Sequence, residues 1–511
     1  MVKFRTLNIV LLIFLLMFFS INPVNAQKEK NKPKTLHFAI SYAFNKDYDP
    51  LDRNIIQVQP FYSCIYSTLF RQDGDANPYP FLIEKYEHRG KTVVFYLKNN
   101  ACFSDGSPIT SDEVIHTIEA GMIHPTSPNT IYKIIEGGDK FFQKKKGHCP
   151  GIKKLNAKTF EIHFITENVD FASYFTPHKM CILPRERNKT KLLFSGPFQV
   201  DDYKETGRET IIKLKQNPWY IGKRCKIDYL YFHFYANPED YNKAVELGEP
   251  DLFLDVLNST MPVSKCKYNY FKTPGQRGFY LLLNAQKGPL KDKKLRTFLK
   301  YFTMSLDLAE IKGWGLTIPT QLTLPYGLTG YTVFKHIEKK DFKLSIPKKT
   351  IKIKCLNVGN GPRKPLFELL QKKLKKFNLN LDLEWEDSVN NILDRQKRGD
   401  DIDLTAFLYQ VDIPVSCNFY ETLFTPGHEL NLFGYAVPEA IHLLDAYYRE
   451  SSDIKRLKIL ARLEEIAQDE AILIPLVNPL YILGYKNRVK GVCLDRFVGI
   501  CIGDIDVDQR H

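Results

Sequence analysis

Apolar and polar residues alternate over several short segments in the first half of the chain, which is the pattern of strands that bury one face. In the clearest case Val93, Phe95 and Leu97 form an apolar side, and the residues between them form a mixed one. Strands are expected on this basis at residues 35–40, 92–97, 159–165, 210–215 and 229–235. The first half is therefore predicted to be rich in strands, with few long helices.

The second half has a different pattern, in which strand-like and helix-like segments follow one another. Leu366, Leu370 and Leu374 recur at helical spacing, whereas residues 379–385 alternate strictly. The expected order is strand, helix, strand, helix, strand, at residues 350–356, 366–377, 379–385, 389–397 and 403–409. Such an order implies right-handed crossovers and a parallel sheet. Two amphipathic helices that begin at residues 438 and 453, and a strand-rich segment at 472–485, complete the prediction.

The N-terminus has the features of an export signal. Lys3 and Arg5 precede an apolar run at residues 9–19, and small residues at 24–26 match the site that a signal peptidase reads. The alternative is an anchor helix that stays in the membrane, but the run is shorter than the roughly 20 apolar residues that a spanning helix needs. We expect a signal peptide at residues 1–26, cleavage after Ala26, and a soluble periplasmic product.

Residues 103–119 are dense in acids and hydroxyls around a tight turn, as an active site could be. Asp105 and Gly106 form a strong turn dipeptide. Thr110 and Glu113 then have the spacing of a capping box, in which a hydroxyl and a carboxylate satisfy free N–H groups at a helix start. The histidine of this segment has no obvious catalytic partner. The segment is therefore interpreted as a strand, a turn and a capped helix, and no catalytic residue is assigned.

Charge and cysteine content narrow the possible classes of protein. A formal charge of +14 would suit anionic peptides, a membrane surface or nucleic acid. The lysine clusters lack the interleaved aromatics of single-strand binders, so they are interpreted as solvated faces, and no nucleic-acid partner is expected. All ten cysteines follow residue 26 and could either pair in an oxidising compartment or remain buried thiols. None forms a CxxC motif, and no metal or other cofactor is expected.

Four segments, in order, resemble the family 5 extracellular solute-binding proteins, which serve peptide and nickel ABC importers. The first is TVVFYLKNNACFSDGSPITSDEVIHTIE at residues 92–119, and the second is SGPFQVDDYKETGRETIIKLKQNPWYIGK at residues 195–223. The third, GFYLLLNAQKGPLKDKKLRTFLKYFTMSLD at residues 278–307, matches the crossing strand of the family and the helix after it. The fourth, DIDLTAFLYQVDIP at residues 401–414, resembles the loop that lines the ligand cleft.

The resemblance implies an α/β protein with the two-lobed periplasmic-binding-protein fold, in the class with an extra domain, with mixed sheets and a hinge between the lobes. The ligand would be enclosed between the lobes. A discontinuous domain I would comprise residues 34–59, 185–274 and 483–511. Domain II would be inserted at residues 60–184, and domain III, the α/β lobe, would comprise residues 275–482.

The resemblance also implies a peptide site in the fourth segment. In peptide-binding members an aspartate of this loop meets the ligand ammonium; here that position is Asp412, with Tyr409 where the family usually has Trp. A carboxylate in a dry cleft makes a strong charge-assisted hydrogen bond with a cation, and nearby backbone can pair with an extended peptide. Alternatively, Asp412 only caps the turn before Pro414. The expected ligand-binding residues are Gln59, Tyr409, Gln410, Val411 and Asp412.

These features predict a monomeric periplasmic receptor that closes over a peptide and presents it to the permease subunits of an ABC transporter in the inner membrane. An enzyme is not expected, because neither GxSxG nor HExxH occurs. Nucleotide binding is not expected either, since Gly359-Asn360-Gly361 lacks the third glycine of a dinucleotide loop. The alternative that stays open is the same fold with a non-peptide ligand, such as a nickel chelate, haem or another small molecule.

Overall fold

The computed structural model describes residues 33–44, 48–51, 56–73, 77–124, 130–167, 170–185, 192–255, 267–308, 311, 317–320, 322–334, 336, 347–359, 363–411, 413–426, 428, 430–495 and 499–508. The expected signal peptide and Asp412 lie outside the described residues, as do Cys266 and residues 360–362. None of the helices in the described part of the chain is long and apolar enough to span a membrane.

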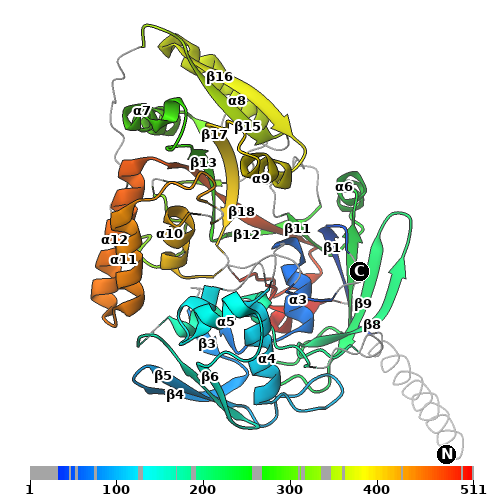
Figure 1. Cartoon of the computed structure of the whole chain (residues 1–511). Coiled ribbons are helices and arrows are strands. Elements are labelled where there is room, and N and C mark those ends of the chain that lie inside the picture. Colours follow the sequence, from blue (N-terminus) through cyan, green and yellow to red (C-terminus); the bar gives the residue numbers. More distant parts are fainter. Residues whose placement is uncertain are drawn as a thin grey trace, which may run out of the picture.

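A long mixed sheet runs through the whole molecule (Figure 1), in the strand order β16-β15-β17-β13-β18-β11-β1-β10-β9-β8. Its upper strands are β13 (Arg277–Leu283), β15 (Ile351–Val358), β16 (Leu379–Glu386) and β17 (Leu404–Gln410). Its lower strands are β1 (Thr35–Ser41), β8 (Phe198–Glu205), β9 (Thr210–Gln216), β10 (Tyr229–Tyr235) and β11 (Leu252–Asp255). The strand β18 (Leu473–Tyr485) is central, and β12 (Asn269–Pro274) and β14 (Thr317–Pro319) also pair with it.

The two ends of β18 belong to different parts of the molecule. Residues 473–477 pair with β13, whereas residues 482–485 pair with β11. We call β13 to β17 with helices α7 to α12 the upper lobe, and β1 to β11, helices α3 to α6 and the chain after β18 the lower lobe (Figure 1). Because β18 is shared by both lobes, it is one of the segments about which they could move.

The upper lobe has the alternating order that its sequence predicts. The predicted parallel pairing is confirmed for β15 with β16 and for β15 with β17. Strand β13 departs from the parallel arrangement, because it pairs antiparallel with β17 and so makes the sheet mixed. The helices of this lobe are α7 (Lys293–Met304), α8 (Arg363–Leu374), α9 (Val389–Lys397), α10 (Ser416–Phe424), α11 (Pro438–Arg449) and α12 (Asp453–Glu470).

The lower lobe contains a second, antiparallel sheet in the order β4-β5-β7-β6. Its strands are β4 (Ile83–Arg89), β5 (Thr92–Leu97), β6 (Ile152–Asn156) and β7 (Thr159–His163), and a hairpin of β2 (Phe70–Gln72) and β3 (Pro78–Pro80) precedes it. The helices of this lobe are α3 (Gln59–Ile65), α4 (Ser111–Met122), α5 (Gly138–Lys144) and α6 (Pro238–Leu247). Short strands β19 (Val489–Lys490) and β20 (Asp506–Val507) pair near the C-terminus.

The segment at residues 103–119 has the structural role that its sequence predicts. The Thr110 backbone N–H donates to the Glu113 carboxylate, and the Asp112 backbone N–H donates to the Thr110 hydroxyl, so the capping box is confirmed. Gly106 has a φ of +86°, and a Cβ at this position would lie 2.9 Å from the Trp219 ring. Both the turn conformation and the tryptophan packed on it therefore require glycine.

Candidate functional site

Three of the expected site residues lie together where β17 leaves the sheet. The Tyr409 side chain is buried, with its ring 6.1 Å from that of Phe419 in α10. The Gln410 amide oxygen accepts a hydrogen bond from the Tyr481 hydroxyl of β18. The Val411 side chain is also buried, and its N–H donates to the Gln276 carbonyl, at 3.2 Å. The end of β17 is thus tied to the strand that both lobes share.

Tyr481 is held in turn by a buried arginine. The Arg277 guanidinium lies 4.0 Å from the centre of the Tyr481 ring and donates to the backbone carbonyls of Pro479 and Leu480. Burial raises the pKa of Tyr481 to about 12, although the Arg277 charge opposes this effect. The Tyr481 phenol therefore stays protonated at neutral pH and acts as the donor to Gln410.

A buried carboxylate fixes the elements that follow the candidate loop. Glu464 of α12 is 1% exposed and accepts hydrogen bonds from the Thr323 and Leu324 N–H groups, the Tyr420 hydroxyl and the Gln468 amide, at 2.7 to 3.2 Å. Burial raises the pKa of Glu464, and these hydrogen bonds oppose the shift. Tyr420 belongs to α10, which begins four residues after Asp412. Through its hydrogen bond to Tyr420, Glu464 therefore holds the helix that follows the candidate loop.

Ion pairs join the upper lobe to the lower lobe at one edge. Asp170 of the lower lobe pairs with Arg456 of α12 and accepts a hydrogen bond from the Tyr447 hydroxyl of α11, at 2.7 Å. Arg456 also donates to the Tyr447 hydroxyl, at 3.0 Å, and burial lowers the pKa of its guanidinium to about 10. These groups touch one another only while the lobes are together.

A second group of interlobe contacts lies at α10. Lys133 of the lower lobe pairs with Glu421 of α10, at 2.7 Å, and Glu421 also accepts from the Tyr448 hydroxyl. The Asn418 amide donates across the same boundary to the Thr130 hydroxyl. Around these polar contacts, one continuous cluster of buried apolar side chains includes members of both lobes, such as Phe175 and Phe419. The lobes are therefore closed on each other at this edge.

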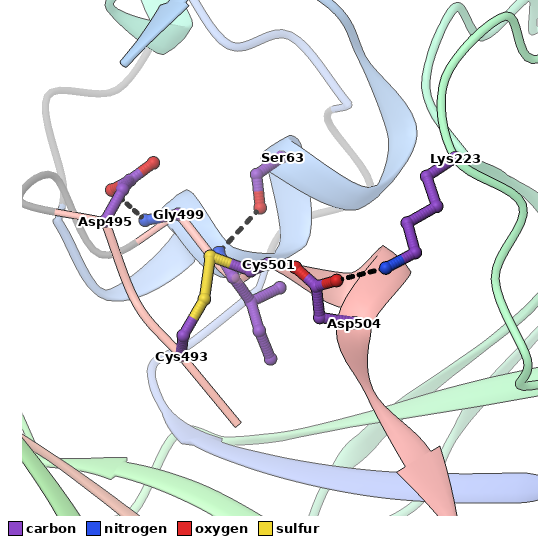
Figure 2. The surroundings of a disulfide bond; sticks show 8 residues. Ser63, Lys223, Cys493, Asp495, Gly499, Cys501 and Asp504 are labelled. Atoms are coloured by element: carbon purple, nitrogen blue, oxygen red, sulfur yellow. Dashed lines mark hydrogen bonds and ion pairs between the residues drawn. A yellow bond between two sulfur atoms is a disulfide. The ribbon is translucent and has the colours of Figure 1, made fainter. Parts of the chain in front are cut away.

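Gln59 lies apart from the residues at the end of β17. It is buried in the first turn of α3 and lines a cavity of about 370 Å³, to which none of residues 409–411 contributes. Residues of the C-terminal segment, from Gly499 to Asp504, form part of the wall of this cavity. There the Ile500 N–H donates to the Ser63 hydroxyl of α3, and Lys223 pairs with Asp504 at 2.5 Å (Figure 2).

The cysteines include one bonded pair, between Cys493 and Cys501, which closes a short loop against α3 (Figure 2). The other described cysteines are free thiols: Cys64, Cys102, Cys149, Cys181, Cys225, Cys355 and Cys417. Both interpretations that the sequence left open thus apply, each to different cysteines. The two bonded cysteines are eight residues apart in the sequence. An even number of cysteines shows that pairing is possible but does not show which two cysteines pair.

Removal of this disulfide should loosen the C-terminal loop. For the double variant Cys493→Ser/Cys501→Ser we expect a loss of about 2.5 kcal/mol in the free energy of unfolding, the entropic effect of so short a loop. Urea unfolding of the oxidised protein and the variant would measure the loss, and Cys355→Ser, at a buried free thiol of the upper lobe, is the comparison. Equal midpoints for the double variant and the oxidised protein would contradict the expected role.

The residues that join the lobes were not predicted from the sequence. Asp170, Arg456, Lys133 and Glu421 are common charged residues without a motif, and their partners are 286 to 288 positions away. Arg71, which lines the cavity at Gln59 and forms no ion pair with the described carboxylates, was missed for the same reason.

Comparison with known proteins shows what this chain resembles. Residues 77–303 match the model of the bacterial extracellular solute-binding proteins, family 5 Middle. The chain is 23% identical over 480 residues to the periplasmic oligopeptide-binding protein OppA of Salmonella typhimurium, with 83% of this chain and 84% of that protein covered. The chain is therefore similar to the family 5 extracellular solute-binding proteins over residues 77–303. This is the family that the four sequence segments resemble.

Solved structures agree with this fold. OppA of Haemophilus influenzae, in complex with the peptide RPPGFSPFR, superposes with a TM-score of 0.74 at 18% identity, covering 93% of this chain and 99% of that one. NikA of Staphylococcus aureus, in complex with Ni(L-His)2, superposes with a TM-score of 0.71 at 17% identity, covering 93% and 100%. The predicted two-lobed fold with mixed sheets is therefore confirmed.

Proposed function

We propose that this protein is a periplasmic receptor that encloses a peptide between its lobes and delivers it to the permease subunits of an ABC importer. The observation that carries the proposal is the position of the loop after β17, which follows directly on the residues tied to the shared strand β18. A ligand held there would contact both lobes, and it would favour the closed form over the open one.

The chemistry at this position suits a peptide. The Nε2 of Gln410 is buried and has no hydrogen-bond partner among the described residues, so it is a donor that a peptide carbonyl could satisfy. The N–H of Val411 is already bonded, and a peptide would therefore pair with later backbone groups of the loop. In this proposal Asp412 binds the ligand ammonium, and Tyr409 forms an aromatic wall of the site. A contribution of Gln59 remains a prediction.

The same proposal includes the organisation of the chain. Residues 1–26 are removed after Ala26, and the mature protein acts as a monomer. Domain I comprises residues 34–59, 185–274 and 483–511, domain II residues 60–184, and domain III residues 275–482. The antiparallel sheet β4-β5-β7-β6 falls entirely within the proposed domain II, and the alternating strands and helices of the upper lobe fall within the proposed domain III, which supports this division.

Titration calorimetry of the mature protein, freed of copurified ligand, with mixed di- to hexapeptides tests the function. We expect saturable binding that requires a free α-amino group. Asp412→Asn should weaken it about 10- to 100-fold, because it removes one charge-assisted hydrogen bond of roughly 1.5 to 3 kcal/mol. Asp401→Asn is the control, since Asp401 precedes β17 and pairs with Lys354 on the surface.

Two results would count against the proposal. If wild type binds no peptide pool, the peptide function is wrong, and nickel chelates and haem become the ligands to titrate next. If peptides bind but N-acetylation and Asp412→Asn have no effect, the peptide function stands, but the ammonium site is placed wrongly.

A further inference from the structure

The cavity beside α3 lies entirely within the lower lobe. Its walls come from α3, the β2–β3 hairpin, a few residues at 176–181, Pro197, Tyr220, Lys223, Asp495 and residues 499–504. Among the described residues, none of the upper lobe lines it. Its volume of about 370 Å³ is within the range of small-molecule sites. A ligand in this cavity would not bridge the lobes, so the cavity is separate from the proposed peptide site.

One cation in the cavity has no acidic partner. The guanidinium of Arg71 stacks on the ring of Phe81, 3.5 Å from its centre. None of the described carboxylates forms an ion pair with it. By contrast Lys223, which lines the same cavity, is neutralised by Asp504. A partly buried cation without a counter-ion is costly, and an anionic ligand would remove that cost.

The remaining walls are apolar on one side and polar on another, where the Asp495 carboxylate accepts a hydrogen bond from the Gly499 N–H. Ile500 and Ile502 are buried at the C-terminal wall, and the Tyr220 ring lies beside the guanidinium, 5.7 Å from it. The hydroxyls of Ser63 and Thr68 and the amide of Gln72 also line the cavity, and the Gln72 Nε2 is buried with no partner among the described residues. The cavity thus offers one planar cation, one free amide donor and an apolar floor.

We propose that this cavity binds a small organic monocarboxylate. The carboxylate would lie in the fork of Arg71, which matches it with two parallel hydrogen bonds, and would accept a further bond from the Gln72 amide. The apolar body of the ligand would pack against Tyr220, Ile500 and Ile502. Because the Asp495 carboxylate also lines the cavity and repels additional negative charge, Arg71 matches a monoanion better than a phosphate, which carries more charge and needs more donors.

Fluorine NMR titration with 4-fluorobenzoate tests this site in the mature protein. We expect saturable binding that persists in the presence of a saturating peptide, and no binding of the neutral analogue 4-fluorobenzamide. Arg71→Gln should weaken binding at least tenfold. The control is Arg89→Gln, which removes the same charge from the same lobe, at an exposed residue of β4 that pairs with Glu87; its affinity should equal that of wild type. Arg71→Lys keeps the charge but loses the fork, and should weaken binding by less than Arg71→Gln.

Several results would overturn the proposal. These are non-saturable binding to wild type, equal affinity of wild type and a folded Arg71→Gln variant, and stronger binding of inorganic phosphate than of 4-fluorobenzoate. Displacement by one equivalent of peptide would also overturn it, because the cavity would then belong to the peptide site. If Arg71→Gln fails to fold, Arg71→Lys decides: unchanged affinity in that variant contradicts the role of the fork. Apart from displacement by peptide, these results are independent of whether wild type binds peptides.

Discussion

Replacement of Asp170 by alanine is expected to open the ligand-free protein. In the closed form Arg456 and Tyr447 of the upper lobe direct their polar groups to the Asp170 carboxylate. Without it, the buried guanidinium of Arg456 lacks an anion while the lobes are closed, but it can be hydrated when they separate. We expect the closed form to lose about 2 kcal/mol relative to the open form, which is roughly a thirtyfold shift in their ratio.

Small-angle scattering of the ligand-free protein would detect this shift as an increase in the radius of gyration. Peptide affinity should fall by up to about thirtyfold, because binding must then drive the closure that the ion pair now supports. The matched control is Asp469→Ala, which removes an aspartate that pairs with Lys293 inside the upper lobe. An unchanged radius and an unchanged affinity in Asp170→Ala would show that the contact does not hold the lobes together.

Replacement of Glu464 by alanine is expected to cost about 3 to 5 kcal/mol of the free energy of unfolding. The change leaves the N–H groups of Thr323 and Leu324 and the hydroxyl of Tyr420 buried without their acceptor. Because Tyr420 belongs to α10, the loop that carries Asp412 should also lose its support, and peptide affinity should fall with stability. Urea unfolding and peptide titration of the same preparation would measure both effects.

The isosteric variant Glu464→Gln should change the pH dependence of stability. Burial raises the pKa of Glu464 in the folded state, so the neutral form is favoured there. The protonated form of Glu464 therefore contributes to the free energy of unfolding. This contribution is fully present below the ordinary glutamate pKa of about 4.3 and is lost as pH rises through the folded-state pKa. Glutamine cannot ionise, and so we expect the stability of the variant relative to wild type to increase between pH 4 and pH 7.

Glu465 offers the control for both variants, since it is the next residue of α12 and pairs with Arg462 on the surface. Its replacement by alanine or glutamine should change stability by less than about 1 kcal/mol. A pH profile for Glu464→Gln that runs parallel to that of wild type would mean that Glu464 does not titrate with a raised pKa. An alanine variant as stable as wild type would refute its positioning role.

The individual strands, helices and caps of this protein can be predicted from residues that are close together in the sequence. The alternation at residues 92–97 becomes β5, and the leucine spacing at residues 366–374 becomes α8. Thr110 and Glu113 produce the capping box because their spacing of three residues is itself the geometry of the motif. The sequence resemblance indicated the two-lobed fold for a related reason, since its motifs are turns and caps whose residues lie close together in the chain.

The site depends on contacts that no local pattern encodes. The sequence alone predicted the order of strands and helices and the two-lobed fold, and it singled out the loop that carries Asp412 as the candidate site. Only the tertiary structure decided that Gln59 lines a separate cavity, that Arg71 forms no ion pair with the described carboxylates, and that Asp170 meets Arg456. Periodicity and capping act over a few residues, whereas burial and charge pairing depend on which segments the fold brings together, and here those segments are hundreds of residues apart.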